Sequence, residues 1–173
     1  IHAREYAVVD LNKDGINDLY VADHGYDAPP FPGFRNQLFL SQGGQAQWMD
    51  ATAALPGDWD FTHSVTTGDV NGDGNVDIFV GNNGGTMMQR SHVLFGNGAG
   101  GFSANFAVLP TMNPGLTASH LVDLDGNELP ELVTGMMHSL KMNQVYWNQA
   151  GSYTSQLPTF LAEPVNFGND WGV

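Results

Sequence analysis

Short apolar runs recur along the chain and alternate with polar, glycine-rich stretches. The clearest runs are residues 19–22, 78–81 and 132–135, and each follows directly on an acidic stretch. Runs of about four residues, rich in β-branched and aromatic side chains and bounded by turn residues, favour strands over helices. The pattern therefore predicts an all-β protein.

Aligning the three acidic stretches brings further strands into register. Three runs lie upstream and three lie downstream of them: residues 6–9, 65–68 and 119–122, and residues 36–43, 91–98 and 143–150. In each unit an aromatic residue is then expected to open a further strand: Trp48, Phe102 and Tyr153. Four short strands in a repeat of about 50 to 60 residues are typical of a propeller blade.

The 173-residue chain divides into repeat units at about 1–59, 60–113 and 114–165, with 166–173 as the start of a fourth. The predicted fold class is an all-β, partial β-propeller: one domain, 1–173, of three four-stranded blades plus the first strand of a fourth. Closed propellers use about four to eight blades. We therefore expect further blades, supplied either by a longer chain or by neighbouring subunits.

The acidic stretch in the second unit, residues 69–77, reads DVNGDGNVD. Oxygen-bearing side chains stand at positions 1, 3, 5 and 9, and glycine stands at position 6. Alternate residues of a tight turn can point inward around one cation, and Ca²⁺ binds oxygen ligands at about 2.3–2.6 Å. Glycine at position 6 permits a positive φ. The stretch predicts a calcium loop.

The loop recurs at residues 10–18 (DLNKDGIND) and 123–131 (DLDGNELPE), the latter with Glu128 in place of the glycine. Solvated acidic turns without metal are the alternative reading, to which Glu128 adds weight in the third loop. Position 12 lacks the bidentate glutamate of an EF-hand. We expect about three Ca²⁺ ions, one per loop, with a main-chain carbonyl as the ligand at position 7. The candidate ligands are Asp10, Asn12, Asp14, Ile16 and Asp18; Asp69, Asn71, Asp73, Asn75 and Asp77; and Asp123, Asp125, Asn127, Leu129 and Glu131.

The Asp-x-Asn-x-Asp-Gly-x-x-Asp loop, followed by an apolar strand and glycine, resembles the FG-GAP (VCBS-type) repeat of integrin α-chain propellers and many secreted bacterial proteins. The resemblance covers essentially the whole chain. It implies a β-propeller with Ca²⁺ in the loop that joins the first two strands of a blade. The family spans adhesion, sugar binding and a few polysaccharide-degrading enzymes, so the resemblance leaves the activity open.

The net charge is −13, but ten of the eighteen acidic residues lie inside the three loops. Three Ca²⁺ ions would supply six positive charges. The remaining acidity, with only five Lys and Arg residues, argues against nucleic acid or an anionic membrane as a partner. Sites of the extracellular type fill at about 10⁻⁴ to 10⁻³ M calcium. We therefore expect a secreted or cell-surface protein without membrane insertion.

The sequence predicts a structural, adhesion or recognition module whose partner is an extracellular glycan, a protein, or further propeller blades. A polysaccharide lyase or hydrolase and a calcium-dependent filament subunit are the alternatives. We expect no catalytic residue, although His63 beside Asp60 offers an acid–base pair that nothing in the sequence requires. The proline-rich connection 24–35 either seals a blade edge or presents Tyr26 and Phe31 to a sugar ring or partner chain.

Overall fold

The computed structural model of the chain describes residues 2–43, 45–57, 59–84, 90–112, 115–136 and 143–155. Within these ranges there are three four-stranded sheets and one short 3₁₀ turn, Thr52–Ala54. The described part contains no helix with the length and apolar character that a bilayer crossing requires. The predicted start of a fourth unit, 166–173, lies outside the described residues.

Each sheet is an antiparallel meander, because strands adjacent in sequence are also hydrogen-bonded neighbours. The strands of the first sheet are β1 (Ala3–Val9), β2 (Asp18–Asp23), β3 (Gln37–Gln42) and β4 (Gln45–Asp50). Those of the second are β5 (Thr62–Gly68), β6 (Asp77–Asn82), β7 (His92–Gly96) and β8 (Phe102–Asn105). Those of the third are β9 (Leu116–Val122), β10 (Glu131–Met136), β11 (Gln144–Gln149) and β12 (Ser152–Thr154).

The three sheets fall within the three predicted repeat units, and the all-β prediction is confirmed. Two boundaries were wrong. Ser152 opens β12, one residue before the predicted Tyr153, and β4 begins at Gln45, so Trp48 lies inside the strand instead of opening it. The cause is a tight β3–β4 connection, in which Gln42 already pairs with Gln45. Phe102, by contrast, opens β8 as expected.

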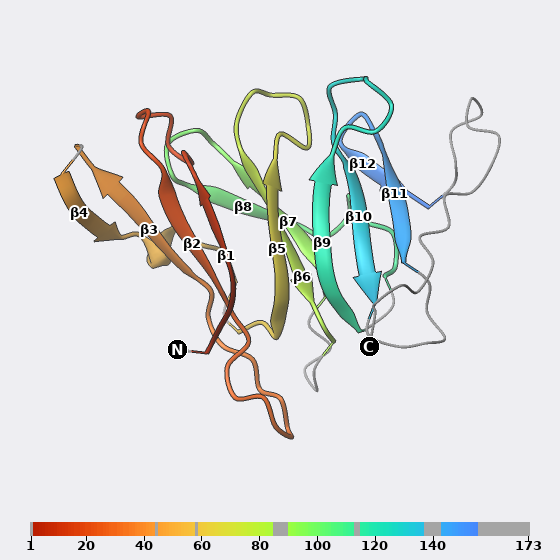
Figure 1. Ribbon diagram of the computed structural model, residues 1–173, viewed down its shortest axis with the longest axis horizontal. Helices are drawn as coiled ribbons and strands as arrows, with labels where there is room; N and C mark the ends of the chain where they lie inside the picture. Colours follow the sequence, from red (N-terminus) through yellow and green to blue (C-terminus); the bar gives the residue numbers. More distant parts are fainter. Residues whose placement is uncertain are drawn as a thin grey trace, which may run out of the picture.

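The sheets stand side by side, and the first strands β1, β5 and β9 contact one another in that order (Figure 1). The three acidic loops, which join β1 to β2, β5 to β6 and β9 to β10, all lie at one end of the sheets. The long β2–β3 connection lies at the opposite end. The repeat thus places its acidic loops in a row and keeps them apart from the proline-rich connection.

Two apolar layers hold the sheets together. Between the first and second sheets lie Leu38, Val65 and Ile78, and between the second and third lie Phe79 and Leu132. Ile78 and Phe79 are consecutive and point to opposite faces, as side chains in a strand must. The second sheet is therefore buried on both faces.

Polar contacts fix how the first strands lie against one another. The Glu5 carboxylate on β1 accepts a hydrogen bond from the Val65 backbone N–H on β5 at 2.7 Å. The Ser64 and Ser119 hydroxyls lie 2.7 Å apart, which joins β5 to β9. These contacts place each sheet at a defined height against its neighbour, so the three acidic loops end at the same level.

Candidate metal centres

Each acidic loop joins the first strand of a sheet to the second. Its ninth residue is the first residue of that second strand: Asp18 begins β2, Asp77 begins β6 and Glu131 begins β10. All three of these acidic side chains are fully buried, at 0% exposure. The loop therefore closes on a carboxylate fixed within the sheet.

The carboxylate at position 1 organises the turn. Asp69 accepts hydrogen bonds from the backbone N–H groups of Gly72 at 2.8 Å, Asp73 at 3.1 Å and Gly74 at 2.7 Å. Asp10 and Asp123 accept the corresponding bonds from positions 5 and 6 of their own loops. One carboxylate thus gathers three or more backbone donors and folds the loop around itself.

Positions 3 and 5 continue the pattern one step further along. The side-chain oxygen of Asn71 accepts the N–H of Asp73 at 3.0 Å, and Asp73 in turn accepts the N–H of Asn75 at 2.8 Å. The other two loops repeat both contacts, at Asn12 and Asp14 and at Asp125 and Asn127. The side chains at 1, 3 and 5 are consequently folded back onto the loop backbone in the same way in all three loops.

The buried acid at position 9 bridges the loop to the third strand of its sheet. Asp18 accepts the N–H of Leu11 at 2.8 Å with one oxygen and the N–H of Ser41 at 2.8 Å with the other. Glu131 does the same with Leu124 at 2.7 Å and Asn148 at 3.4 Å. The acid at position 9 therefore connects the loop to the sheet, a structural role that the sequence did not predict.

All three loops use the left-handed backbone region twice, at positions 4 and 6. Glycine occupies both positions in the second loop, Gly72 at φ 73° and Gly74 at φ 81°. In the third loop Gly126 (φ 79°) takes position 4 and Glu128 takes position 6 at φ 69°. With Glu128 at position 6, the third loop has the same backbone conformation there as the second loop has with glycine. Glu128 therefore does not prevent the turn from forming.

The loop carboxylates fall into two electrostatic classes. Desolvation raises the pKa of Asp10, but backbone hydrogen bonds, first from Gly15, outweigh it, and the net pKa is lowered. Burial instead raises the pKa of Asp77 to about 6, against the lowering effect of the Gly96 and Val70 N–H groups, and it raises that of Glu131. Without a cation, the surroundings therefore stabilise the ionised form of the outer carboxylate and destabilise the ionised form of the buried one.

The third loop gathers its acids most closely. Carboxylate oxygens of Asp123, Asp125 and Glu131 all lie within 4.8 Å of one another. In the first two loops position 3 is asparagine, which contributes an amide oxygen instead. Each set offers oxygen atoms alone, the donors that a hard divalent cation such as Ca²⁺ prefers. The side chains at 1, 3, 5 and 9 have the donor chemistry for such an ion, and the predicted ligand at position 7 is the main-chain carbonyl of Ile16, Asn75 or Leu129.

At the opposite end of the sheets, the acid–base pair suggested for His63 does not form. Asp60 lies instead 4.0 Å from His92 and accepts a hydrogen bond from the Asn82 amide at 2.9 Å. Burial raises the pKa of Asp60, while His92 lowers it. His63 instead contacts His24, with ring centroids 5.6 Å apart. Residues three positions apart in extended backbone point to opposite faces, which accounts for the separation of His63 from Asp60.

Sequence reasoning missed a line of buried amides that links the first two sheets. Asn36 accepts the Asp23 N–H at 2.9 Å and donates to Thr62 at 3.0 Å, and Thr62 donates to Asn82 at 3.1 Å. The available signal was the polar residue that precedes the third strand in every unit, Asn36, Ser91 or Asn143. Each of the three accepts a backbone N–H from the second strand of its sheet.

The aromatic residues of the 24–35 connection separate into two groups. Phe31 packs against Phe61 with ring centroids 5.4 Å apart, which removes it as an open face for a ligand. Tyr26 is 63% exposed, as an open face requires. The sequence did not single out Phe34 and Trp59, whose ring centroids lie 5.5 Å apart near Tyr26.

Comparison with known proteins supports the repeat assignment. A search of curated proteins found no match to the chain. The family model described as FG-GAP-like repeat matches twice, over residues 10–80 and 69–134, and each match begins at the first aspartate of an acidic loop. Together the matches span most of the chain and all three loops. The chain therefore belongs to the FG-GAP-like repeat family.

Proposed function

We propose that this chain is a calcium-binding segment of an extracellular β-propeller, in which each ion fastens the first two strands of a blade. The observation that carries the proposal is the threefold recurrence of one loop geometry. Side-chain oxygens at positions 1, 3 and 5 accept backbone N–H groups in the same order in every loop, and each loop ends on a buried carboxylate at position 9.

Electrostatics supplies the need for a cation. Asp69, Asp73 and Asp77 bring three carboxylates into one nine-residue turn, and the two neighbouring acids help to raise the pKa of Asp77. A divalent ion at the centre would reverse that repulsion and favour the ionised state of the buried acid. Binding energy then becomes part of the folding free energy.

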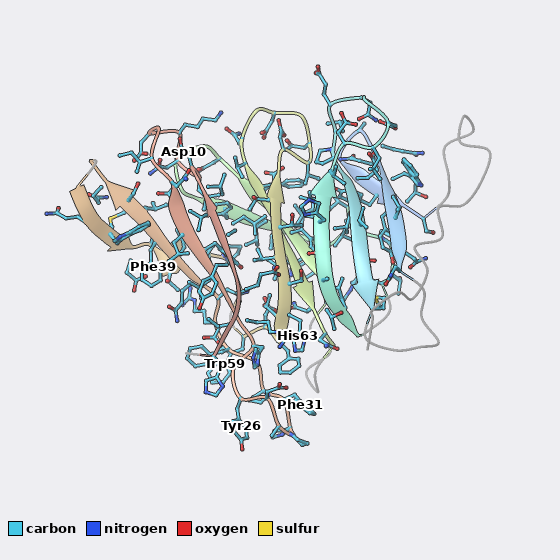
Figure 2. The ribbon with its side chains drawn as sticks, viewed as in Figure 1. Asp10, Tyr26, Phe31, Phe39, Trp59 and His63 are labelled. Atoms are coloured by element: carbon cyan, nitrogen blue, oxygen red, sulfur yellow. The ribbon has the colours of Figure 1, made fainter. Side chains whose placement is uncertain are left out.

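The packing between sheets supports the propeller. Val65 and Leu94 of the second sheet are buried against the first sheet, at 5% and 2% exposure. The equivalent residues of the first sheet are Tyr6, which is 59% exposed, and Phe39, which is half-buried (Figure 2). On its outer face the first sheet thus has apolar side chains at the positions whose equivalents in the second sheet are buried. A further blade on that face would continue the arrangement.

An extracellular setting follows from the same proposal, because open acidic loops of this kind suit millimolar calcium. A structural or recognition role fits a rigid array of sheets whose connections emerge at both ends. The proposal assigns no reaction to the chain.

The test is calorimetric titration of the chelator-treated chain with Ca²⁺, together with thermal unfolding. We expect about three sites, and a Tm higher by about 10 °C at calcium tenfold above Kd. Asp73→Asn removes one carboxylate from an exposed position of the second loop and should weaken one site by at least about tenfold.

Asp27→Asn is the matched control, because Asp27 is an exposed acid outside the loops. This variant should bind calcium as the unsubstituted chain does. An unfolding curve that neither calcium nor chelator moves would contradict the proposal, as would equal losses of affinity in the two variants.

A further inference from the structure

A pocket lies at the end of the sheets opposite the acidic loops, between the β2–β3 connection and the segment that leads into β5. Its volume is about 330 Å³, at the lower end of the range for small-molecule sites. Tyr26, Pro32, Phe34 and Trp59 supply its walls, and Asp23 lies in its floor. Figure 2 shows Tyr26 and Trp59 at this end, far from Asp10.

The walls are largely aromatic and open to solvent. Tyr26 is 63% exposed, Trp59 is 55% exposed and Phe34 is 39% exposed. The Phe34 and Trp59 rings are inclined to each other by 52°, so their faces form two sides of a corner rather than one flat platform. Such a corner fits a compact, rounded group better than a flat ring.

The pocket is already formed without a ligand. Phe34 and Asp60 exchange two backbone hydrogen bonds of 2.8 and 2.9 Å, which fixes Phe34 beside the neighbouring Trp59. Gly25, at φ 68°, packs so closely on Gly33 that a Cβ would collide with the Gly33 carbonyl. These contacts hold the walls in place and reduce the ordering cost of binding.

The floor carries a negative charge. Asp23 is fully buried, and its carboxylate accepts the N–H of Gly25 at 2.8 Å and that of His2 at 3.1 Å. No Lys, Arg or His side chain of the described residues lies within 4.0 Å of it. The pocket lining contains no Lys or Arg, and the His2 ring that also lines it packs edge-on against His24 at a centroid distance of 6.1 Å. Buried charges are normally paired. A cation in the pocket would balance this one through space.

We propose that this pocket binds a quaternary ammonium group. Ring faces attract such a cation within about 6 Å of their centroids, and the buried carboxylate adds to the attraction. A primary ammonium carries three N–H donors and a sugar carries several hydroxyls, and both need direct acceptors. The Asp23 oxygens are enclosed and already accept backbone N–H groups, whereas a quaternary ammonium needs no hydrogen bond.

The test follows the indole signal of Trp59 in ¹⁵N-labelled, calcium-saturated protein during titration with tetramethylammonium chloride, against sodium chloride at equal ionic strength. We expect saturation at millimolar concentration, and binding about tenfold weaker in Trp59→Leu as judged by calorimetry. Trp48→Leu is the control, because Trp48 is similarly exposed (51%) but lies on β4, outside the pocket. Asp23→Asn should weaken binding by a similar factor.

Choline and its neutral carbon isostere, 3,3-dimethylbutan-1-ol, separate cation recognition from simple apolar burial. Choline should bind at least about tenfold more tightly than the isostere. Equal binding of the two would overturn the proposal, as would a shift of the Trp59 signal by methyl glucoside but not by tetramethylammonium. If Asp23→Asn changes the circular dichroism spectrum, the isostere pair and Trp59→Leu decide the question. Saturating calcium throughout keeps this result independent of the calcium titration.

Discussion

Gly96 at the end of β7 donates its backbone N–H to the buried carboxylate of Asp77 over 2.9 Å. A Cβ at Gly96 would collide with the main-chain carbonyl of Val76, the residue just before Asp77. In the second sheet this approach leaves no room for a side chain at Gly96. The equivalent residues in the other sheets are Ser41 and Asn148, which donate the same N–H to Asp18 and Glu131.

The first prediction concerns that contact. Gly96→Ala should lower the free energy of unfolding by about 2 to 4 kcal/mol, because the methyl group forces β7 away from the loop. Urea unfolding measures the loss. Gly57→Ala is the control: its φ is 89° and no atom lies within 4 Å of the added Cβ, so it should cost only about 1 kcal/mol. Equal losses would show that β7 moves freely.

The second prediction separates the structural role of position 9 from metal binding. With calcium removed by a chelator, Asp18→Asn should destabilise the chain by about 1 to 3 kcal/mol. The asparagine amide has one oxygen, so its NH₂ group must face one of the two backbone N–H donors, that of Leu11 or that of Ser41. Asp14→Asn, at an exposed position, should cost less than about 0.5 kcal/mol under the same conditions. With calcium both variants should lose stability. No loss for Asp18→Asn in chelator would contradict the bridging role.

The third prediction tests the junction of the first two sheets. Glu5→Ala removes the acceptor for the Val65 N–H and should cost about 1 to 2 kcal/mol. Glu5→Gln keeps an oxygen acceptor and should recover at least half of that loss. Thermal unfolding of the two variants side by side decides the point. If Gln is as damaging as Ala, the charge rather than the hydrogen bond holds the sheets.

The fourth prediction is a pH dependence centred on His63. Burial lowers the pKa of His63 to about 4, with further lowering from Arg4 and His24 against an opposing effect of Asp27. Its Nδ1 accepts a hydrogen bond from the Asn83 amide at 3.0 Å, so the folded chain holds the ring neutral. In the unfolded chain the imidazole protonates near pH 6.5.

Below pH 6.5 the unfolded state therefore binds a proton at His63 that the folded state does not bind, so the free energy of unfolding decreases as the pH falls to about 4. The loss due to this one residue should be roughly 2 to 3 kcal/mol across that interval. His63→Gln should flatten the profile by that amount, whereas His120→Gln, at an exposed position, should leave the profile unchanged. Identical profiles for all three proteins would refute the assignment.

The fifth prediction compares two equivalent residues in different sheets. Tyr6 and Val65 each lie four residues before the first loop aspartate, yet their exposures are 59% and 5%. Val65→Ser should cost about 2 to 3 kcal/mol, because it places a hydroxyl in the apolar layer. Tyr6→Ser should cost less than about 1 kcal/mol in the isolated chain. A large loss at Tyr6 would mean that another copy already covers that face.

Much of this protein follows from its sequence because its information is local and repeated. Position 9 of each loop is an acid that begins a strand, and alternation through Ile78 and Phe79 assigns opposite faces without knowledge of the neighbours. Three copies of the pattern made the four-strand unit recognisable and located the three acidic turns between the first and second strands. The carboxylate at position 1 accepts N–H groups of its own loop, so that part of the turn is encoded locally, whereas the carboxylate at position 9 also needs the third strand.

The tertiary structure alone decided which residues outside the repeated positions meet. Asn36 and Thr62 join the first unit to the second, whereas Asp60 with His92 and Phe34 with Trp59 meet within one unit. In each case the separation in sequence carries no period. Those contacts depend on the path of the connections and on how one sheet packs on the next, which the shapes and volumes of the side chains set. The repeated pattern in the sequence specifies each sheet. The partners of residues between sheets are set only by the way in which the sheets pack.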